Sequence, residues 1–362
     1  MAQSSGSSTV ETAIKFGEPK GIPLYLDAYQ PAGTGPFGAV ILVHGGGWQF
    51  GERENLAEVA RYLADNEFAA FTVDYRRSNR EGAHYNPYPA AVQDIRRAIR
   101  WVRAHADTYH VDPKRLGLLG SSAGGQLVSL VGMQGRGRLD SGVRVKAVVA
   151  WSGPQDMVEL ERDGIARART AVEAFTNCTD GLPKCEPILR EVSPLTYVDP
   201  SDPPLFFANG THELVPLPGA EEMDAALTAS GVPHQLVVVP GSRHAQHYSD
   251  SIAPGLPAGQ TVMQASLAWL QEWVNGVKPR PSPTPAPTTD SSHRAGGNAT
   301  VLLAAIGGAV LLFVAATAVV ILRRRARRAR RVREWRHGQS GSGLHSGSRS
   351  RSTRSGTRHH AM

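Results

Sequence analysis

The chain has 362 residues, of which 41% are hydrophobic, and it carries a formal net charge of +7. This length suits one large domain with additional segments, or two domains, and the hydrophobic content is ordinary for a soluble core. The positive charge is concentrated at one end, because residues 323–362 contain 13 arginines, no lysine and one acidic residue. The remainder is mildly acidic, so the charge does not support a specific nucleic-acid-binding role for the main body.

Residues 1–12 are small and polar, and we expect them to be disordered. Residues 13–275 are predicted to form one domain of alternating strands and helices. Apolar residues at spacings of three and four predict a helix over 91–103, and an amphipathic segment predicts another over 261–274. Continuous apolar runs, typical of strands buried on both faces, occupy 39–43, 69–73, 116–119, 145–150, 204–208 and 235–239. Such alternation indicates an α/β fold, with a mostly parallel sheet covered by helices on both faces.

The composition changes after residue 275. The proline-rich segment 276–299 predicts an extended linker. Residues 300–322 carry no charge, and a helix of that length would span roughly 34 Å, enough to cross a membrane. The arginine-rich segment 323–362 is predicted to be a disordered tail.

The arginines directly after the predicted span favour a single-pass protein of the cell membrane with a cytoplasmic tail. The main domain would then be extracytoplasmic, and the proline-rich linker agrees with that orientation. Residues 1–12 lack the charged start and apolar run of a signal peptide. This favours the opposite orientation, a cytoplasmic domain with a tail anchor, which stays open as the alternative.

The chain contains two cysteines, Cys178 and Cys185, separated by seven positions. We expect a disulfide between them if the domain lies outside the cytoplasm, and two free thiols are the alternative. A zinc site is not expected, because two cysteines without nearby paired histidines provide too few ligands.

The segment 120–124, Gly-Ser-Ser-Ala-Gly, is the most informative about function. It lies between the predicted strand 116–119 and a predicted helix. Glycines on both sides allow a sharp strand-to-helix turn that keeps the central serine clear of its neighbours. Ser122 is therefore the candidate nucleophile, and it needs a base, an acid that orients the base, and donors for an oxyanion.

The base and the acid are expected after the last two strands. His244 follows the strand 235–239 and is the predicted base. Glu213 follows the strand 204–208 and is the predicted acid. The nucleophile, acid and base then follow one another along the chain as Ser122, Glu213 and His244, which is one of the orders in which such triads occur. Two further histidines and two fallback acids stay open as substitutes for these roles: His247, His234, Asp202 and Asp224.

A glycine-rich turn at 44–48, His-Gly-Gly-Gly-Trp, directly follows the first strong strand. Its glycines allow backbone N–H groups to approach a substrate oxygen, so Gly46 and Gly47 are predicted to form an oxyanion hole with the N–H of Ala123. An ordinary glycine-rich turn is the alternative. Phosphate binding is disfavoured because the spacing of both phosphate-loop motifs is absent. Trp48 is expected to form a pocket wall.

These motifs, in this order, resemble those of the α/β-hydrolases, in particular the hormone-sensitive-lipase-like group and its bacterial feruloyl-esterase-like (BD-FAE-type) carboxylesterases. The resemblance covers roughly residues 14–275 and rests also on the segments 94–98, 111–116 and 152–154. It does not extend to the linker, the span or the tail. One departure is Glu213, since members of this family most often have aspartate at that position.

The resemblance implies a serine hydrolase that cleaves a small carboxylic ester through an acyl-enzyme on Ser122, without a metal or an organic cofactor. An amidase or peptidase on the same scaffold is the alternative, because His244 could also protonate a leaving amine. A non-catalytic binding module is disfavoured by the complete set of serine, acid and histidine. The segment 153–200 is expected to cap the pocket, and the oligomeric state stays open.

Overall fold

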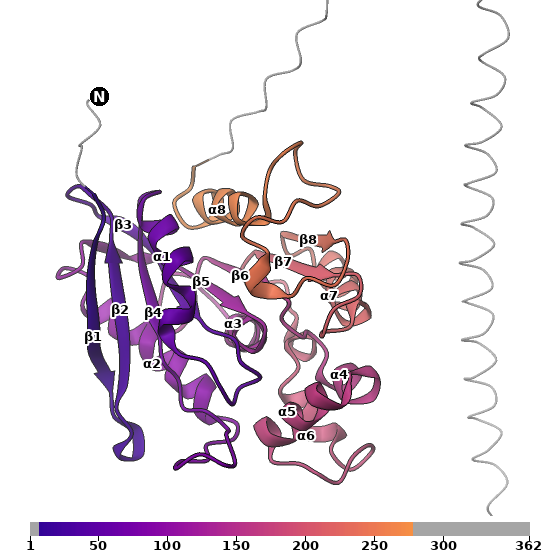
Figure 1. Cartoon of the computed structure of the whole chain (residues 1–362). Coiled ribbons are helices and arrows are strands. Elements are labelled where there is room, and N and C mark those ends of the chain that lie inside the picture. Colours follow the sequence, from indigo (N-terminus) through magenta and orange to yellow (C-terminus); the bar gives the residue numbers. More distant parts are fainter. Residues whose placement is uncertain (1–6, 278–362) are drawn as a thin grey trace, which may run out of the picture. The chain divides into compact units, whose positions relative to one another are not determined.

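The computed structural model describes residues 7–277 as a layered α/β domain (Figure 1). Within this range, one sheet has the strand order β1-β2-β4-β3-β5-β6-β7-β8. β2 pairs antiparallel with β1 and β4, and all the other neighbours are parallel. The bounds are β1 Thr9–Gly17, β2 Leu24–Gln30, β3 Phe37–Val43, β4 Phe68–Val73, β5 Val111–Ser121, β6 Ala147–Trp151, β7 Leu205–Gly210 and β8 His234–Val239.

Helices connect the strands and cover the sheet. The α-helices of the described range are α1 Ala57–Ala64, α2 Ala90–Ala104, α3 Ala123–Met133, α4 Met157–Asp163, α5 Ala166–Thr176, α6 Glu186–Glu191, α7 Leu217–Ser230 and α8 Val262–Trp273. The 3₁₀ turns are η1 Pro19–Gly21, η2 Arg53–Leu56, η3 Pro194–Tyr197 and η4 Ala245–His247.

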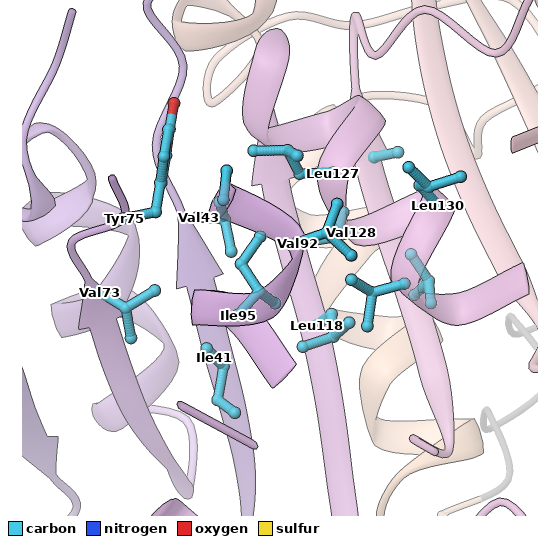
Figure 2. Close-up of a cluster of buried hydrophobic side chains, with 14 of the residues drawn as sticks. Ile41, Val43, Val73, Tyr75, Val92, Ile95, Leu118, Leu127, Val128 and Leu130 are labelled. Atoms are coloured by element: carbon cyan, nitrogen blue, oxygen red, sulfur yellow. The ribbon is translucent and has the colours of Figure 1, made fainter. Parts of the chain in front are cut away.

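The two faces of the sheet form two separate hydrophobic clusters. On β3, Val40 and Leu42 belong to a cluster with residues of α1 and α8. Ile41 and Val43 alternate with them and belong to the opposite cluster, together with residues of α2 and α3; Figure 2 shows part of this second cluster. Because both faces of β3 are buried, its sequence is a continuous apolar run rather than an alternating one.

The structure confirms the predicted α/β fold and its mostly parallel sheet. The prediction of disorder over residues 1–12 is wrong at its end, because β1 begins at Thr9. Backbone pairing of Thr9 with Gln30 of β2 orders this segment, although its side chains are mainly exposed. An exposed edge strand has no apolar face, so hydrophobic patterning does not detect it.

A disulfide joins Cys178 and Cys185 in the loop between α5 and α6, as expected. Among residues 7–277, no helix combines the length and the hydropathy needed to cross a membrane. The predicted span 300–322 and tail 323–362, and the linker from residue 278 onward, lie outside the described residues.

Candidate active site

Ser122 lies at the junction of β5 and α3, in a backbone conformation that a serine rarely adopts. Its φ is 54° and its ψ is −119°, and its N–H donates a 2.7 Å hydrogen bond to the carbonyl of Trp151 on β6. The turn is tight, because a Cβ at Gly120 would collide with the carbonyl of Gly124, and a Cβ at Gly124 with the carbonyl of Val43. Backbone strain of this kind is found where a side chain must be held in a set direction.

His244 lies after β8, and its imidazole lies between the serine and the acid. Its Nε2 is 2.8 Å from Ser122 Oγ, and its Nδ1 forms a hydrogen bond with Oε2 of Glu213. The structure therefore brings together Ser122, His244 and Glu213 from the ends of three strands. A neutral imidazole that donates through Nδ1 to the carboxylate leaves Nε2 free to accept the serine proton.

The carboxylate of Glu213 is fully buried and satisfied by three donors on its second oxygen. Oε1 accepts hydrogen bonds from the Gly210 N–H at 2.6 Å, the Ser152 hydroxyl at 2.9 Å and the Tyr248 hydroxyl at 2.8 Å. The other oxygen, Oε2, is the one that binds His244. Three donors stabilise the ionised form of a buried carboxylate, which would otherwise be costly.

Ser152 and Tyr248 are functional candidates that sequence reasoning missed. The Ser152 hydroxyl also accepts a 2.9 Å hydrogen bond from the N–H of Ala245, next to the histidine. Burial and the neighbouring negative charge of Glu213 raise the pKa of Tyr248, so its hydroxyl remains a donor. Ser152 lies in the segment 152–154 that contributes to the family resemblance, but the sequence indicates no role for it. Tyr248 has no motif of its own, and its only signal is its sequence proximity to His244.

The glycine-rich turn after β3 presents unused backbone donors. Gly46 and Gly47 have φ values of 116° and 57°, and the carbonyl of Gly46 closes the turn by accepting from the N–H groups of Gln49 and Phe50. Within residues 7–277, no acceptor is found for the N–H groups of Gly46, Gly47 or Ala123. All three residues line the same cavity as Ser122, which is the arrangement that an oxyanion hole needs.

The first and last residues of this turn support the site. His44 is buried against the ring of Tyr75, and burial lowers its pKa to about 4, so it is neutral at physiological pH. Trp48 lines the cavity, as predicted, and it is fixed by stacking on Phe175 and by donating to Gln126 at 2.9 Å.

The four substitute acids and bases do not reach Ser122. Asp202 precedes β7, at the opposite end of that strand from Glu213, and it lies 3.7 Å from Arg144. Burial raises the pKa of Asp202 to about 7. Asp224 pairs with His234, and the N–H of His247 donates to the carbonyl of His244.

A cavity of about 1030 Å³ opens over Ser122 and His244. One wall consists of the turn after β3, and the other consists of α4 and α5, from the segment expected to cap the pocket. In the described part of the chain, no group of three or more His, Cys, Asp or Glu side chains is placed to hold a metal ion.

Comparison with known proteins gives a matching family model and curated relatives that are named as esterases or ester hydrolases. The BD-FAE family model matches residues 26–227, more than half of the chain. LipM of Mycobacterium tuberculosis, a probable carboxylic ester hydrolase, is 28% identical over 192 residues, covering 51% of this chain and 43% of LipM. Esterase LipC of the same organism is 29% identical over 193 residues, covering 50% and 46%. The matched region is thus less than half of the length of these relatives.

Two solved structures with a similar architecture are named as esterases. Esterase 2 of Thermogutta terrifontis, phosphonylated by sarin, superposes with a TM-score of 0.60 at 21% identity, covering 75% of this chain and 97% of that one. A truncated carbohydrate esterase from gut microbiota gives a TM-score of 0.59 at 22% identity, covering 74% and 97%. At these identities the likeness establishes the fold. The chain has the α/β-hydrolase fold and belongs to the BD-FAE family.

Proposed function

We propose that this protein is a serine hydrolase that cleaves carboxylic esters through an acyl-enzyme. The observation that carries the proposal is the 2.8 Å contact between Ser122 Oγ and His244 Nε2 at the floor of an open cavity. A hydroxyl is a weak nucleophile unless a neighbouring base removes its proton. The names of the relatives, carboxylic ester hydrolase and esterase, support the ester as the substrate class.

The reaction proceeds in two steps. Ser122 Oγ attacks the ester carbonyl carbon while His244 Nε2 takes the hydroxyl proton, and the resulting imidazolium then gives that proton to the leaving alcohol. Water, deprotonated by the same nitrogen, then attacks the acyl-enzyme, and the imidazolium returns the proton to Ser122 Oγ as the acid is released. Glu213 holds the imidazole in the correct tautomer and stabilises its positive charge.

The tetrahedral intermediates carry a negative charge on the former carbonyl oxygen. In our proposal the N–H groups of Gly46, Gly47 and Ala123 donate to this oxygen. Such preformed donors act without reorganisation, and the loss of one typically costs about 3 kcal/mol of transition-state stabilisation. We also propose that α4 and α5 set the preference for the acyl and alcohol groups, because both helices line the cavity.

Replacement of the nucleophile tests the proposal directly. The full-length chain and its Ser122→Ala variant are assayed with p-nitrophenyl acetate and butyrate, with Ser141→Ala, an exposed serine, as the matched control. We expect Ser122→Ala to lose a factor of about 10⁴ or more in kcat, on the order seen when a catalytic serine is removed. Turnover by Ser122→Ala at the control rate would refute the assignment. Labelling by a fluorophosphonate, located by mass spectrometry, should occur on Ser122.

We further propose that residues 300–322 anchor the protein in the cell membrane with the hydrolase domain outside and the arginine-rich tail inside. The uncharged segment followed by arginines supports this orientation, and so does the Cys178–Cys185 disulfide, since disulfides persist in oxidising compartments. A protease added to intact cells should digest the hydrolase domain. Protection of the domain until the cells are lysed would refute this orientation.

A further inference from the structure

The cavity over Ser122 has an unusual charge distribution. Among residues 7–277, the only ionisable side chain besides His244 that lines it is Arg167 on α5. No aspartate or glutamate is among the lining residues, and the other polar side chains there, such as Gln49, Asn55 and Thr170, are uncharged. Arg167 is therefore the one side chain with a permanent charge among the described residues that line the cavity.

This guanidinium is not neutralised by the protein. Within residues 7–277, Arg167 forms no ion pair, and none of its nitrogens has a hydrogen-bond acceptor in the protein. Arg162, on the preceding helix α4, differs in this respect, because it pairs with Asp163. Arg169 on α5 also forms no ion pair among the described residues, but it does not line the cavity. All five N–H donors of Arg167 are thus available to a bound molecule.

Arg167 lies on α5, one of the two helices that form the cap side of the cavity. Ala168, Thr170 and Ala171 of the same helix also line the cavity, so α5 contributes small uncharged side chains to this wall in addition to the guanidinium. The cavity volume of about 1030 Å³ is at the upper end of the range for small-molecule sites. It can hold a substrate that carries a second functional group in addition to the ester at Ser122.

We propose that Arg167 is a subsite for an anionic group of the substrate, so that the enzyme prefers esters that also carry a carboxylate. This inference rests on the proposed esterase function and deepens it. A planar guanidinium matches the two oxygens of a carboxylate and can donate two parallel hydrogen bonds to them. An unpaired cation in a cavity without acidic groups also attracts anionic substrates and raises their local concentration.

Matched ester pairs test the preference. On the acyl side, the p-nitrophenyl ester of adipic acid is compared with that of monomethyl adipate. On the alcohol side, 4-acetoxybenzoate is compared with its methyl ester. In each pair one substrate carries the carboxylate and the other does not, and rates are corrected for hydrolysis without enzyme. The ratio of kcat/KM for the anionic and the neutral ester is measured for the full-length wild type, Arg167→Gln, Arg167→Lys and the control Arg169→Gln.

We expect Arg167→Gln to lower this ratio at least about fivefold in one of the pairs, through a rise in KM that is larger for the anionic ester than for the neutral one. This size corresponds to a charged hydrogen bond weakened by solvent exposure. Arg167→Lys should keep part of the preference, and Arg169→Gln all of it. Raising NaCl from about 0.05 to about 0.5 M should reduce the wild-type ratio but not that of Arg167→Gln, because salt screens an exposed ion pair.

Unchanged ratios in both pairs, or an equal loss for both members of each pair, would overturn the anionic subsite and leave the esterase function intact. Failure of the proposed function has a different signature, since neither neutral ester would then be hydrolysed in a Ser122-dependent manner. The anionic subsite is still decided in that case by calorimetric binding of adipate to the wild type and to Arg167→Gln. Weaker binding to the variant supports the subsite, and equal binding overturns it.

Discussion

Replacement of Glu213 by aspartate shortens the side chain by one methylene and keeps its charge. In the structure, Glu213 reaches a buried position where Oε1 meets Gly210, Ser152 and Tyr248 while Oε2 meets His244. The variant tests whether the distance from the backbone to the carboxylate matters, independently of the negative charge. It also asks why this chain has glutamate at a position where the family resemblance implies aspartate.

The expected magnitude follows from the distances. Removal of a carbon–carbon bond of about 1.5 Å would stretch contacts of 2.6, 2.8 and 2.9 Å to roughly 4 Å, beyond hydrogen-bond range. The carboxylate also retreats from His244, and a misplacement of about 1 Å in a catalytic array costs on the order of 100-fold. We therefore expect kcat for Glu213→Asp to fall about 100-fold, with KM changed less than about threefold.

The assay is steady-state hydrolysis of p-nitrophenyl butyrate, with thermal unfolding to verify that each variant is folded. Glu213→Gln keeps the length and loses the charge, and it should fall about 10⁴-fold, as expected when the acid of a triad becomes neutral. Glu221→Asp, an exposed position on α7, is the control for the chemical change alone. If Glu213→Asp kept more than about a third of the wild-type kcat, the length argument would be wrong.

Three smaller changes test the surroundings of the site. Tyr248→Phe removes one donor to Glu213, and we expect kcat to fall about tenfold; an unchanged kcat would contradict its positioning role. Burial lowers the pKa of His44 to about 4, whereas a histidine in the unfolded chain has a pKa of about 6.5. Between these two pH values the unfolded state binds a proton at His44 that the folded state does not bind. The wild type should therefore lose up to about 3 kcal/mol of unfolding free energy between pH 7 and pH 4. A His44→Asn variant should lose less unfolding free energy over the same pH range. If urea titrations gave the same pH dependence for the variant and the wild type, His44 would not be the group responsible. Replacement of both Cys178 and Cys185 by serine should lower the unfolding free energy by about 2.5 kcal/mol. The wild type with this disulfide reduced should have the same unfolding free energy as that variant in urea titrations.

The sequence predicts the central sheet well, because its strands are buried on both faces. β3, β4 and β7 each form an uninterrupted buried run, and such runs are visible without knowledge of their partners. The residues at the carboxyl ends of these strands can be predicted for the same reason. Parallel strands bring their carboxyl ends to one edge, so Ser122, Glu213 and His244 are expected to meet there.

The sequence does not predict features whose stability comes from tertiary contacts. β1 is an exposed edge strand that exists through its pairing with β2, and the cap helices α4 and α6 have seven and six residues, too short for a periodic signal. The roles of Ser152 and Tyr248 are defined by an oxygen of Glu213, 61 and 35 positions away. Spacing along the chain contains no information about such a contact.

A single hydroxyl couples the loop of the acid to the loop of the base. Ser152 Oγ donates to Glu213 Oε1 and accepts from the N–H of Ala245, so it holds both loops at once. Its backbone is in the left-handed region, with a φ of 48°, which costs about 1 kcal/mol or more for a residue other than glycine. Two buried hydrogen bonds offset that cost. Glu213 and His244 follow different strands, so the distance between them depends on how β7 and β8 end relative to β6. The hydroxyl of Ser152, directly after β6, stabilises this distance because it binds to both loops. A glutamate, longer by one methylene than aspartate, can then serve as the acid, because its Oε1 accepts a hydrogen bond from the hydroxyl of Ser152.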